Sequence, residues 1–206
     1  RRPRWRRWRP SWAAPPPPGE GRGSTARPGA ARCGRPGAVK GWDEAEFADR
    51  NLLAPCGLYC GVCGVYLATR NGDAKFQALL GKLYGSAPEE TACRGCMQPE
   101  PPALLYGYCR VCPIRECVQG RGFYSCHQCG DWPCALVTGF PIATGRRVMA
   151  RAIPLWRQQV ACLGAGAGDV AWARAEGERY HCPHCGEPLF RGAQRCRACK
   201  AAVAEG

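Results

Sequence analysis

The sequence lacks both the long hydrophobic runs and the export signal that would direct it into or across a membrane. No apolar stretch in its 206 residues approaches the roughly 18 residues that a membrane-spanning helix needs. The amino-terminal segment has no hydrophobic core of a signal peptide, because residues 13–18 read AAPPPP. We therefore expect a cytoplasmic protein with no membrane span.

Acidic residues are scarce at the amino terminus. Residues 1–40 hold 11 basic residues and one acidic residue, so they contribute +10 of the formal net charge of +13. The segment is also rich in Pro and Gly and has almost no aliphatic residues, so it cannot build a core. We predict a disordered basic tail over residues 1–41. Its composition is the one that a GC-rich nucleotide sequence would encode if it were translated ahead of the true start codon. The alternating Arg and Trp of residues 1–9 would also suit a nucleic-acid-binding arm.

Catalytic signatures are missing as well. The sequence has no P-loop, no nucleophile elbow and no pair of carboxylates that would serve acid–base catalysis. His127 lies inside a C-x2-C motif, where we expect a structural role rather than a catalytic one. An enzyme is therefore not favoured, and no catalytic residue is assigned.

Cysteine, in contrast, is abundant, with 17 residues. Four of these residues share a paired spacing near the carboxyl terminus, Cys182-x2-Cys185-x10-Cys196-x2-Cys199. The two-residue gap lets both sulfurs of one turn reach a single ion, and ten residues suffice for a β-hairpin that brings the two pairs together. The spacing predicts a β-hairpin zinc ribbon over residues 180–201, with these four thiolates as ligands and with His181 and His184 as non-ligands.

Eleven further cysteines are predicted to bind metal. They are Cys56, Cys60, Cys63, Cys93, Cys96, Cys109, Cys112, Cys117, Cys126, Cys129 and Cys134. A C-x2-C-x4-C spacing that begins at Cys109 recurs 17 residues later at Cys126. The surrounding chain is rich in Pro and Gly, so bound metal rather than a large hydrophobic core should order it. One partition gives two closed four-thiolate zinc centres between residues 93 and 134, but the grouping stays open.

The first three of these thiols allow a different cofactor. Cys56, Cys60 and Cys63 have the C-x3-C-x2-C spacing that binds the open-site [4Fe-4S] cluster of radical S-adenosylmethionine enzymes. Those enzymes continue with alternating strands and helices, whereas here a single helix and Cys-rich loops follow. We therefore expect zinc as the cofactor and retain an iron–sulfur cluster at these three residues as the alternative.

One amphipathic helix is predicted clearly by apolar periodicity. Apolar residues at i, i+3, i+4 and i+7 from Phe76 predict a helix that begins after Asp73 or Asn71 and ends before Gly85.

A second apolar stripe predicts a helix over residues 144–163, kinked or split at Pro154. Asp169 is predicted to cap a short helix after it. The expected fold is a small, mainly α, metal-stabilised cysteine-rich domain with irregular loops, followed by the ribbon. The expected units are a cysteine-rich metal-binding domain at 42–143, a helical connector at 144–179 and the zinc ribbon at 180–201.

Several motifs together resemble a known family. In chain order they read LAPCGLYCGVCGVYLAT (53–69), CRGC (93–96), CPIRECV (112–118) and CHQCGDWPC (126–134). They resemble the uncharacterised prokaryotic family named domain of unknown function 3795, and AWARAEGERYHCPHCG is similar to members that add a Trp-containing helix and a zinc ribbon. The resemblance spans about residues 50–200 and implies a cysteine-rich, metal-binding domain without an established activity. Among the eleven central cysteines, Cys109 is extra relative to the family pattern.

We expect a metal-supported module that binds another macromolecule. An iron–sulfur or thiol redox protein is the first alternative. The second is a nucleic-acid-binding ribbon, because basic residues crowd it at Arg191, Arg195, Arg197 and Lys200. Only Phe190 offers a stacking surface there, so a solvated basic face is the preferred interpretation of these residues.

Overall fold

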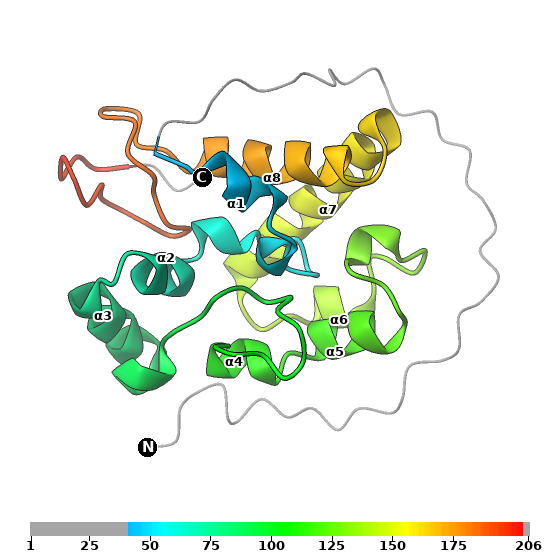
Figure 1. Ribbon diagram of the computed structural model, residues 1–206, viewed down its shortest axis with the longest axis horizontal. Coiled ribbons are helices and arrows are strands. Elements are labelled where there is room, and N and C mark those ends of the chain that lie inside the picture. The colour runs from blue at the N-terminus through cyan, green and yellow to red at the C-terminus, as the bar shows by residue number, and fades with distance from the viewer. Residues whose placement is uncertain (1–40, 204–206) are drawn as a thin grey trace.

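Helices make up nearly all of the regular structure in residues 41–203, the part of the chain that the computed structural model describes (Figure 1). The α-helices are α1 Glu44–Ala48, α2 Gly64–Arg70, α3 Ala74–Tyr84, α4 Gly107–Arg110, α5 Pro113–Gly120, α6 Ala135–Thr138, α7 Ala143–Leu163 and α8 Ala167–Arg179. Short 3-10 helices are η2 Arg50–Leu52, η3 Cys60–Val62, η4 Pro88–Glu90 and η5 Cys126–Gln128. The predicted tail at 1–41 lies outside the described residues except for Gly41.

Helix α3 confirms the clearest prediction. The Asp73 carboxylate accepts the backbone N–H of Phe76 at 2.9 Å and caps the amino end. Gly85 ends the helix in a left-handed conformation with φ of 67°, which glycine adopts without steric cost. The apolar stripe is only partly buried, since Leu80 lies in the core whereas Leu83 is 68% exposed.

The two longest helices, α7 and α8, are joined by a short turn and cross while packing against each other (Figure 1). Trp156 of α7 stacks on Trp172 of α8, with ring centroids 3.7 Å apart and planes inclined by 5°. A Cβ atom on Gly168 would lie 2.5 Å from the Cα of Val160, so only glycine allows this close approach. The crossing supplies the rigid support for the loops around it.

Two details of α7 and α8 differ from the sequence-based expectation: α7 is not split at Pro154, and α8 begins before Asp169. Pro154 lies inside α7 without splitting it, because Ile153 and Trp156 on either side are fully buried and hold the helix in place. Asp169 is not the N-cap of α8, since the helix begins after Gly166, which takes a positive φ of 80°. The Asp169 carboxylate instead reaches back and accepts the Gly166 N–H at 3.1 Å.

The predicted carboxyl-terminal β-hairpin is not seen, and the described residues contain no strand. Each C-x2-C loop instead closes on itself through one isolated antiparallel bridge, between residues 181 and 188 and between residues 195 and 202. Between the two loops, the Arg191 N–H donates to the carbonyl of Val62 at 2.8 Å. The linking chain is thus bonded to the helical part, so its backbone is not available to pair the two loops as strands.

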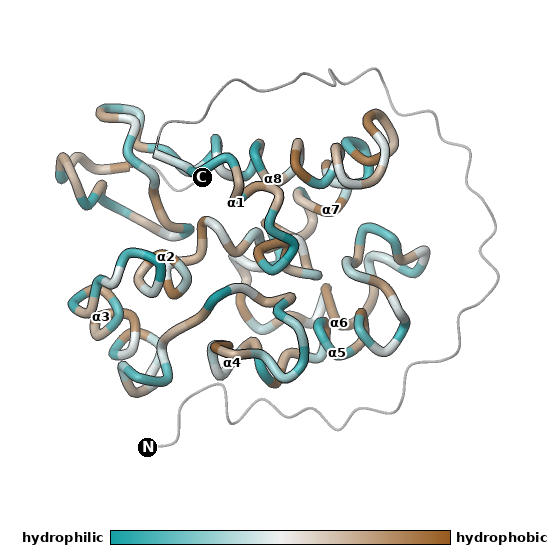
Figure 2. Tube along the Cα trace, viewed as in Figure 1, coloured by the Kyte–Doolittle hydropathy of each residue, from teal (hydrophilic) through white to brown (hydrophobic). Residues whose placement is uncertain are grey.

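The larger of two core clusters runs from Trp42 to Cys196, so the carboxyl-terminal loops pack onto the helices, and a smaller cluster forms around Phe76 and Leu80. Figure 2 shows hydrophobic and hydrophilic residues mixed along the helices. Within residues 41–203, no helix has the length and apolar character required to cross a membrane.

Candidate metal centres

The four carboxyl-terminal cysteines meet at one point. The Sγ atoms of Cys182 and Cys199 are 3.6 Å apart, those of Cys185 and Cys196 are 3.7 Å apart, and all four lie within 4.8 Å of one another. A tetrahedral zinc ion about 2.3 Å from each sulfur would hold the sulfurs about 3.8 Å apart. The donor set and its spacing therefore fit a four-thiolate metal ion.

Two matching backbone loops position these sulfurs. The Gly186 N–H donates to the Cys182 carbonyl at 2.8 Å, and at the equivalent place the Lys200 N–H donates to the Cys196 carbonyl at 3.0 Å. Both donors take left-handed conformations, with φ of 71° for Gly186 and 63° for Lys200. Among the described residues, Lys200 is the one non-glycine residue with a positive φ. The second loop therefore reaches the geometry of the first despite an unfavourable side chain.

The second loop also favours the metal-binding form of its cysteine. The Cys199 N–H donates to the Cys196 sulfur, and this hydrogen bond is the largest contribution that lowers the pKa of Cys196 to about 7. Since metals bind the thiolate, a lower thiol pKa reduces the proton competition that an incoming ion meets. No histidine belongs to the cluster.

The central cysteines are arranged more loosely. Among residues 41–203, the carboxyl-terminal site is the one group of at least three Cys, His, Asp or Glu side chains whose ligand atoms all lie within 4.8 Å of one another. None of the fifteen predicted ligand cysteines forms a disulfide. The eleven central thiols instead form two looser groups of four, with three further thiols beside them.

The first group, called here the Cys60 group, consists of Cys60, Cys93, Cys96 and Cys109. The Cys60 thiol is hydrogen bonded to Cys96, and the Cys96 thiol is in turn hydrogen bonded to Cys109. Cys93 lies beside them and accepts the Gly95 N–H at 3.4 Å. Burial raises the pKa of Cys93 to about 11, so a metal ion must displace its proton.

The second group, called here the Cys117 group, consists of Cys117, Cys126, Cys129 and Cys134. All four line one cavity of about 30 Å³, whose other walls are mainly apolar. A space of this size is suited to one ion or one water molecule. Arg121 Nη1 donates to the Cys129 sulfur at 3.2 Å, which places a positive charge beside this group.

The three thiols of the predicted three-thiolate site lie within electrostatic reach of one another in chain order, Cys56 of Cys60 and Cys60 of Cys63. Cys56 interacts most strongly with Cys112, while Cys60 interacts with Cys96 and Cys63 lies next to Cys60. Burial, followed by the nearby Cys112, raises the pKa of Cys56 to about 12. Cys56 also lies within electrostatic reach of Cys126, so it stands with Cys112 between the two groups.

Three arginine side chains hold the cysteine loops in place through contacts that the sequence did not indicate. The contacts are Arg115 Nε to Cys96 O at 2.8 Å, Arg157 Nε to His127 O at 2.9 Å, and Arg191 Nη2 to Tyr59 O at 2.9 Å. Each joins positions at least 19 residues apart. No sequence signal marks them, because any backbone carbonyl can be the acceptor.

His127 has the structural role that its position suggested. Its ring stacks on Trp156 with centroids 4.6 Å apart, and burial lowers its pKa to about 4. The ring is therefore a neutral part of the core at neutral pH.

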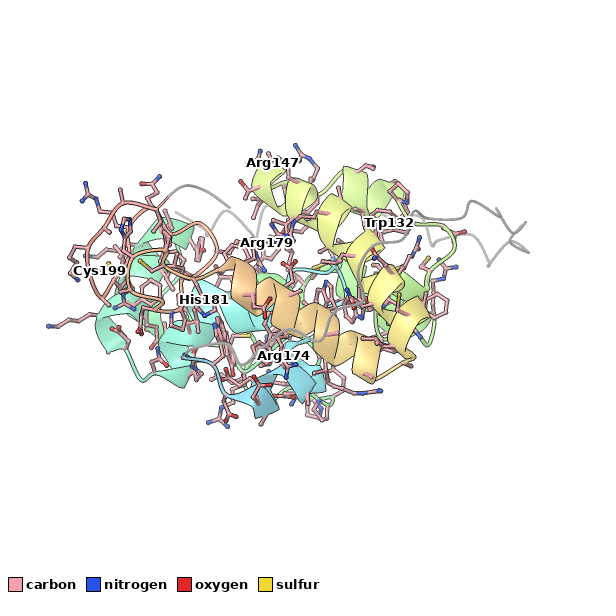
Figure 3. The ribbon with its side chains drawn as sticks, turned by 90° about the horizontal axis from the view of Figure 1, so that it is seen from above. Trp132, Arg147, Arg174, Arg179, His181 and Cys199 are labelled. Carbon is pink, nitrogen blue, oxygen red and sulfur yellow. The ribbon has the colours of Figure 1, made fainter. Side chains whose placement is uncertain are left out.

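The two ends of the molecule hold different cysteine regions. Figure 3 shows Cys199 at one end and Trp132, which lines the cavity of the Cys117 group, toward the other. The helices α7 and α8 lie between them.

The central region also matches a known family. Residues 52–139 match the family model described as a protein of unknown function (DUF3795). The match covers less than half of the chain, and over this range the chain is similar to the DUF3795 family. The matched range contains all eleven central cysteines and ends before the carboxyl-terminal site. Searches of the curated proteins and of the solved structures gave no match.

Proposed function

We propose that this protein is a zinc-binding adaptor, in which thiolate-bound ions order loops that bind another macromolecule. The observation that carries this proposal is the near-tetrahedral spacing of the sulfurs of Cys182, Cys185, Cys196 and Cys199. A zinc ion closed off by four thiolates has no open position and no redox chemistry, so it stabilises structure. The two loops around it would then form a zinc ribbon that lacks a hairpin.

In the same proposal, the Cys60 group and the Cys117 group each bind one ion. Both groups bring thiols from separate segments together, and the chain around them forms only short helices and turns. Such short elements stabilise the loops only weakly, so metal binding would supply the missing folding free energy. Cys56, Cys63 and Cys112 lie beside these groups and outside the two proposed four-thiolate sets.

Metal analysis of the anaerobically purified full-length chain tests this function. We expect native mass spectrometry to find one zinc ion for each four-thiolate group, and we expect a colourless protein. A metal-free protein with an unchanged melting temperature would contradict the proposal.

An iron–sulfur cluster in the Cys60 group is the second candidate. The observation that favours it is that these buried sulfurs are not all within 4.8 Å of one another, and a multinuclear cluster spans a wider set of ligands than a single zinc ion does. Iron together with a visible absorption band that disappears in Cys60→Ser would establish it. Zinc at this group would exclude it.

Nucleic-acid binding through the ribbon has less support. Arg197 forms an ion pair with Asp73, and its guanidinium lies 4.0 Å from the centre of the Phe76 ring. Arg191 is held on the carbonyl of Tyr59. Because these two arginines already bind groups of the protein, fewer charges remain for a phosphate backbone.

A further inference from the structure

A separate cavity lies among the first turn of α7, the end of α8 and the carboxyl-terminal loops. Its volume is about 270 Å³, and its polar wall consists mainly of Thr144, Arg147, Arg179, His181 and Arg191. We propose that this cavity binds a small organic phosphate. The cavity wall contains none of the cysteine ligands, although it shares the carboxyl-terminal loops with the four-cysteine site.

The charge of the cavity is the first argument. Its wall contains three arginines and no aspartate or glutamate among the described residues. Arg147 Nη2 makes a hydrogen bond only to Thr144, at 3.3 Å, and Arg179 forms no hydrogen bond or ion pair within residues 41–203. Guanidinium groups bind phosphate oxygens through paired hydrogen bonds, so arginines without an acidic partner around one cavity favour a doubly charged anion.

Unsatisfied polar groups are the second argument. Arg191 is fixed by its Nη2 on Tyr59, yet its buried Nε has no hydrogen-bond partner. No side chain caps the amino end of α7, whose second residue, Thr144, lines the cavity. Uncapped N–H groups and the positive end of the helix dipole attract anions. The cavity therefore offers hydrogen-bond donors from several directions.

The apolar part of the wall indicates what else the ligand carries. The rest of the wall is mainly apolar and includes Leu189, Phe190, Pro183 and Ala193. The volume approaches the lower end of the range for organic ligands, about 300 Å³, and leaves room beyond a phosphate group. Figure 3 shows Arg147 and Arg179 near each other, with His181 following at the end of α8. A phosphate that bears a small apolar or aromatic group fits this wall, because the arginines can bind the phosphate and the apolar residues can contact the organic group.

Isothermal titration of phenyl phosphate into the full-length, metal-loaded protein tests the proposal. We expect saturable binding that weakens about tenfold in Arg147→Gln and in Arg179→Gln, since each loses charge-assisted hydrogen bonds to the phosphate. Both side chains are exposed and support no core contact, so the variants should fold. Lys82→Gln removes an exposed charge on α3, outside the cavity, and should leave the affinity unchanged.

Native mass spectrometry of each variant separates this result from the metal proposal, because the metal content should stay at the wild-type value. Phenyl phosphate that fails to bind saturably at millimolar concentration overturns the inference. An equal loss of affinity in Lys82→Gln also overturns it, because binding would then follow net charge alone. So does an oligonucleotide that binds through Arg147 and Arg179 while phenyl phosphate does not.

Discussion

The carboxyl-terminal and central cysteines differ in how much of the molecule is needed to bring their sulfurs together. At the carboxyl terminus, each loop is closed by its own backbone hydrogen bonds, and the two loops place four sulfurs within 4.8 Å. In the centre, Cys60 meets Cys96 from a distant part of the chain, and the Cys126 N–H donates to the carbonyl of Pro55 at 2.8 Å. The first site is built by turns, and the second by tertiary packing.

The two regions also differ in electrostatics. A backbone hydrogen bond lowers the pKa of Cys196 to about 7, whereas burial raises that of Cys93 to about 11 and that of Cys56 to about 12. A backbone N–H that donates to a sulfur stabilises the thiolate and lowers the thiol pKa. Burial removes water from the sulfur, destabilises the thiolate and raises the pKa. The carboxyl-terminal thiols do not all share the lowered value. Against a backbone hydrogen bond from Glu187, burial and the neighbouring thiols raise the pKa of Cys185 to about 12.

The largest effect should come from removing a ligand of the carboxyl-terminal site. Cys196→Ser should abolish binding of one zinc ion, because serine does not supply a thiolate and zinc contributes on the order of 10 kcal/mol in such modules. Native mass spectrometry measures the loss. The exposed His184 is outside the ligand set, so His184→Ala is the control and should keep the ion. A full zinc complement in Cys196→Ser would show that the ligands lie elsewhere.

A pair of substitutions decides the ligands of the central region. Cys109→Ser should remove the ion of the Cys60 group, since Cys109 is hydrogen bonded to Cys96, while Cys63→Ser should leave it bound. The metal content of each variant, set against the carboxyl-terminal site as an internal reference, is the measurement. The reverse result would replace Cys109 by Cys63 in the ligand set.

A smaller effect is expected where an arginine clamps a loop. Arg157 also donates through Nη2 to the Cys129 carbonyl at 2.5 Å, so Arg157→Met should lower the free energy of unfolding by about 2 kcal/mol. Denaturant titration measures this change. Arg147 on the same helix binds no loop carbonyl, so Arg147→Met should change the free energy of unfolding by no more than about 0.5 kcal/mol. Equal effects in both variants would argue against the clamp.

The smallest effect compares the two carboxyl-terminal loops with each other. Lys200→Gly should stabilise the site by about 1 kcal/mol, because a side chain at a φ of 63° is strained and glycine is not. Gly186→Ala should destabilise it by a similar amount, for the same reason at the matching position. Thermal melting of the zinc-loaded proteins gives both values. A lower melting temperature in Lys200→Gly would show that the Lys200 side chain contributes more than its strain costs.

Several features could be predicted from sequence because their determinants are close together in the chain. Asp73 and Gly85 set the ends of α3, and the spacing of the last four cysteines identified a group whose sulfurs do converge. The order of the central motifs was sufficient to recognise the family. Each helix cap, cysteine pair and family motif is a short segment, so neighbouring residues are sufficient to identify it.

What only the tertiary structure decided involves partners far apart in the chain. The grouping of the central thiols, the replacement of the hairpin by two self-closed loops, and the clamps made by Arg115, Arg157 and Arg191 all depend on contacts between segments that are distant in the chain. Spacing limits which sulfurs of one turn can share an ion, but a buried thiol or a backbone carbonyl accepts a partner from any segment that packs against it. The sequence therefore determined which cysteines are candidate ligands, and the fold decided which of them meet.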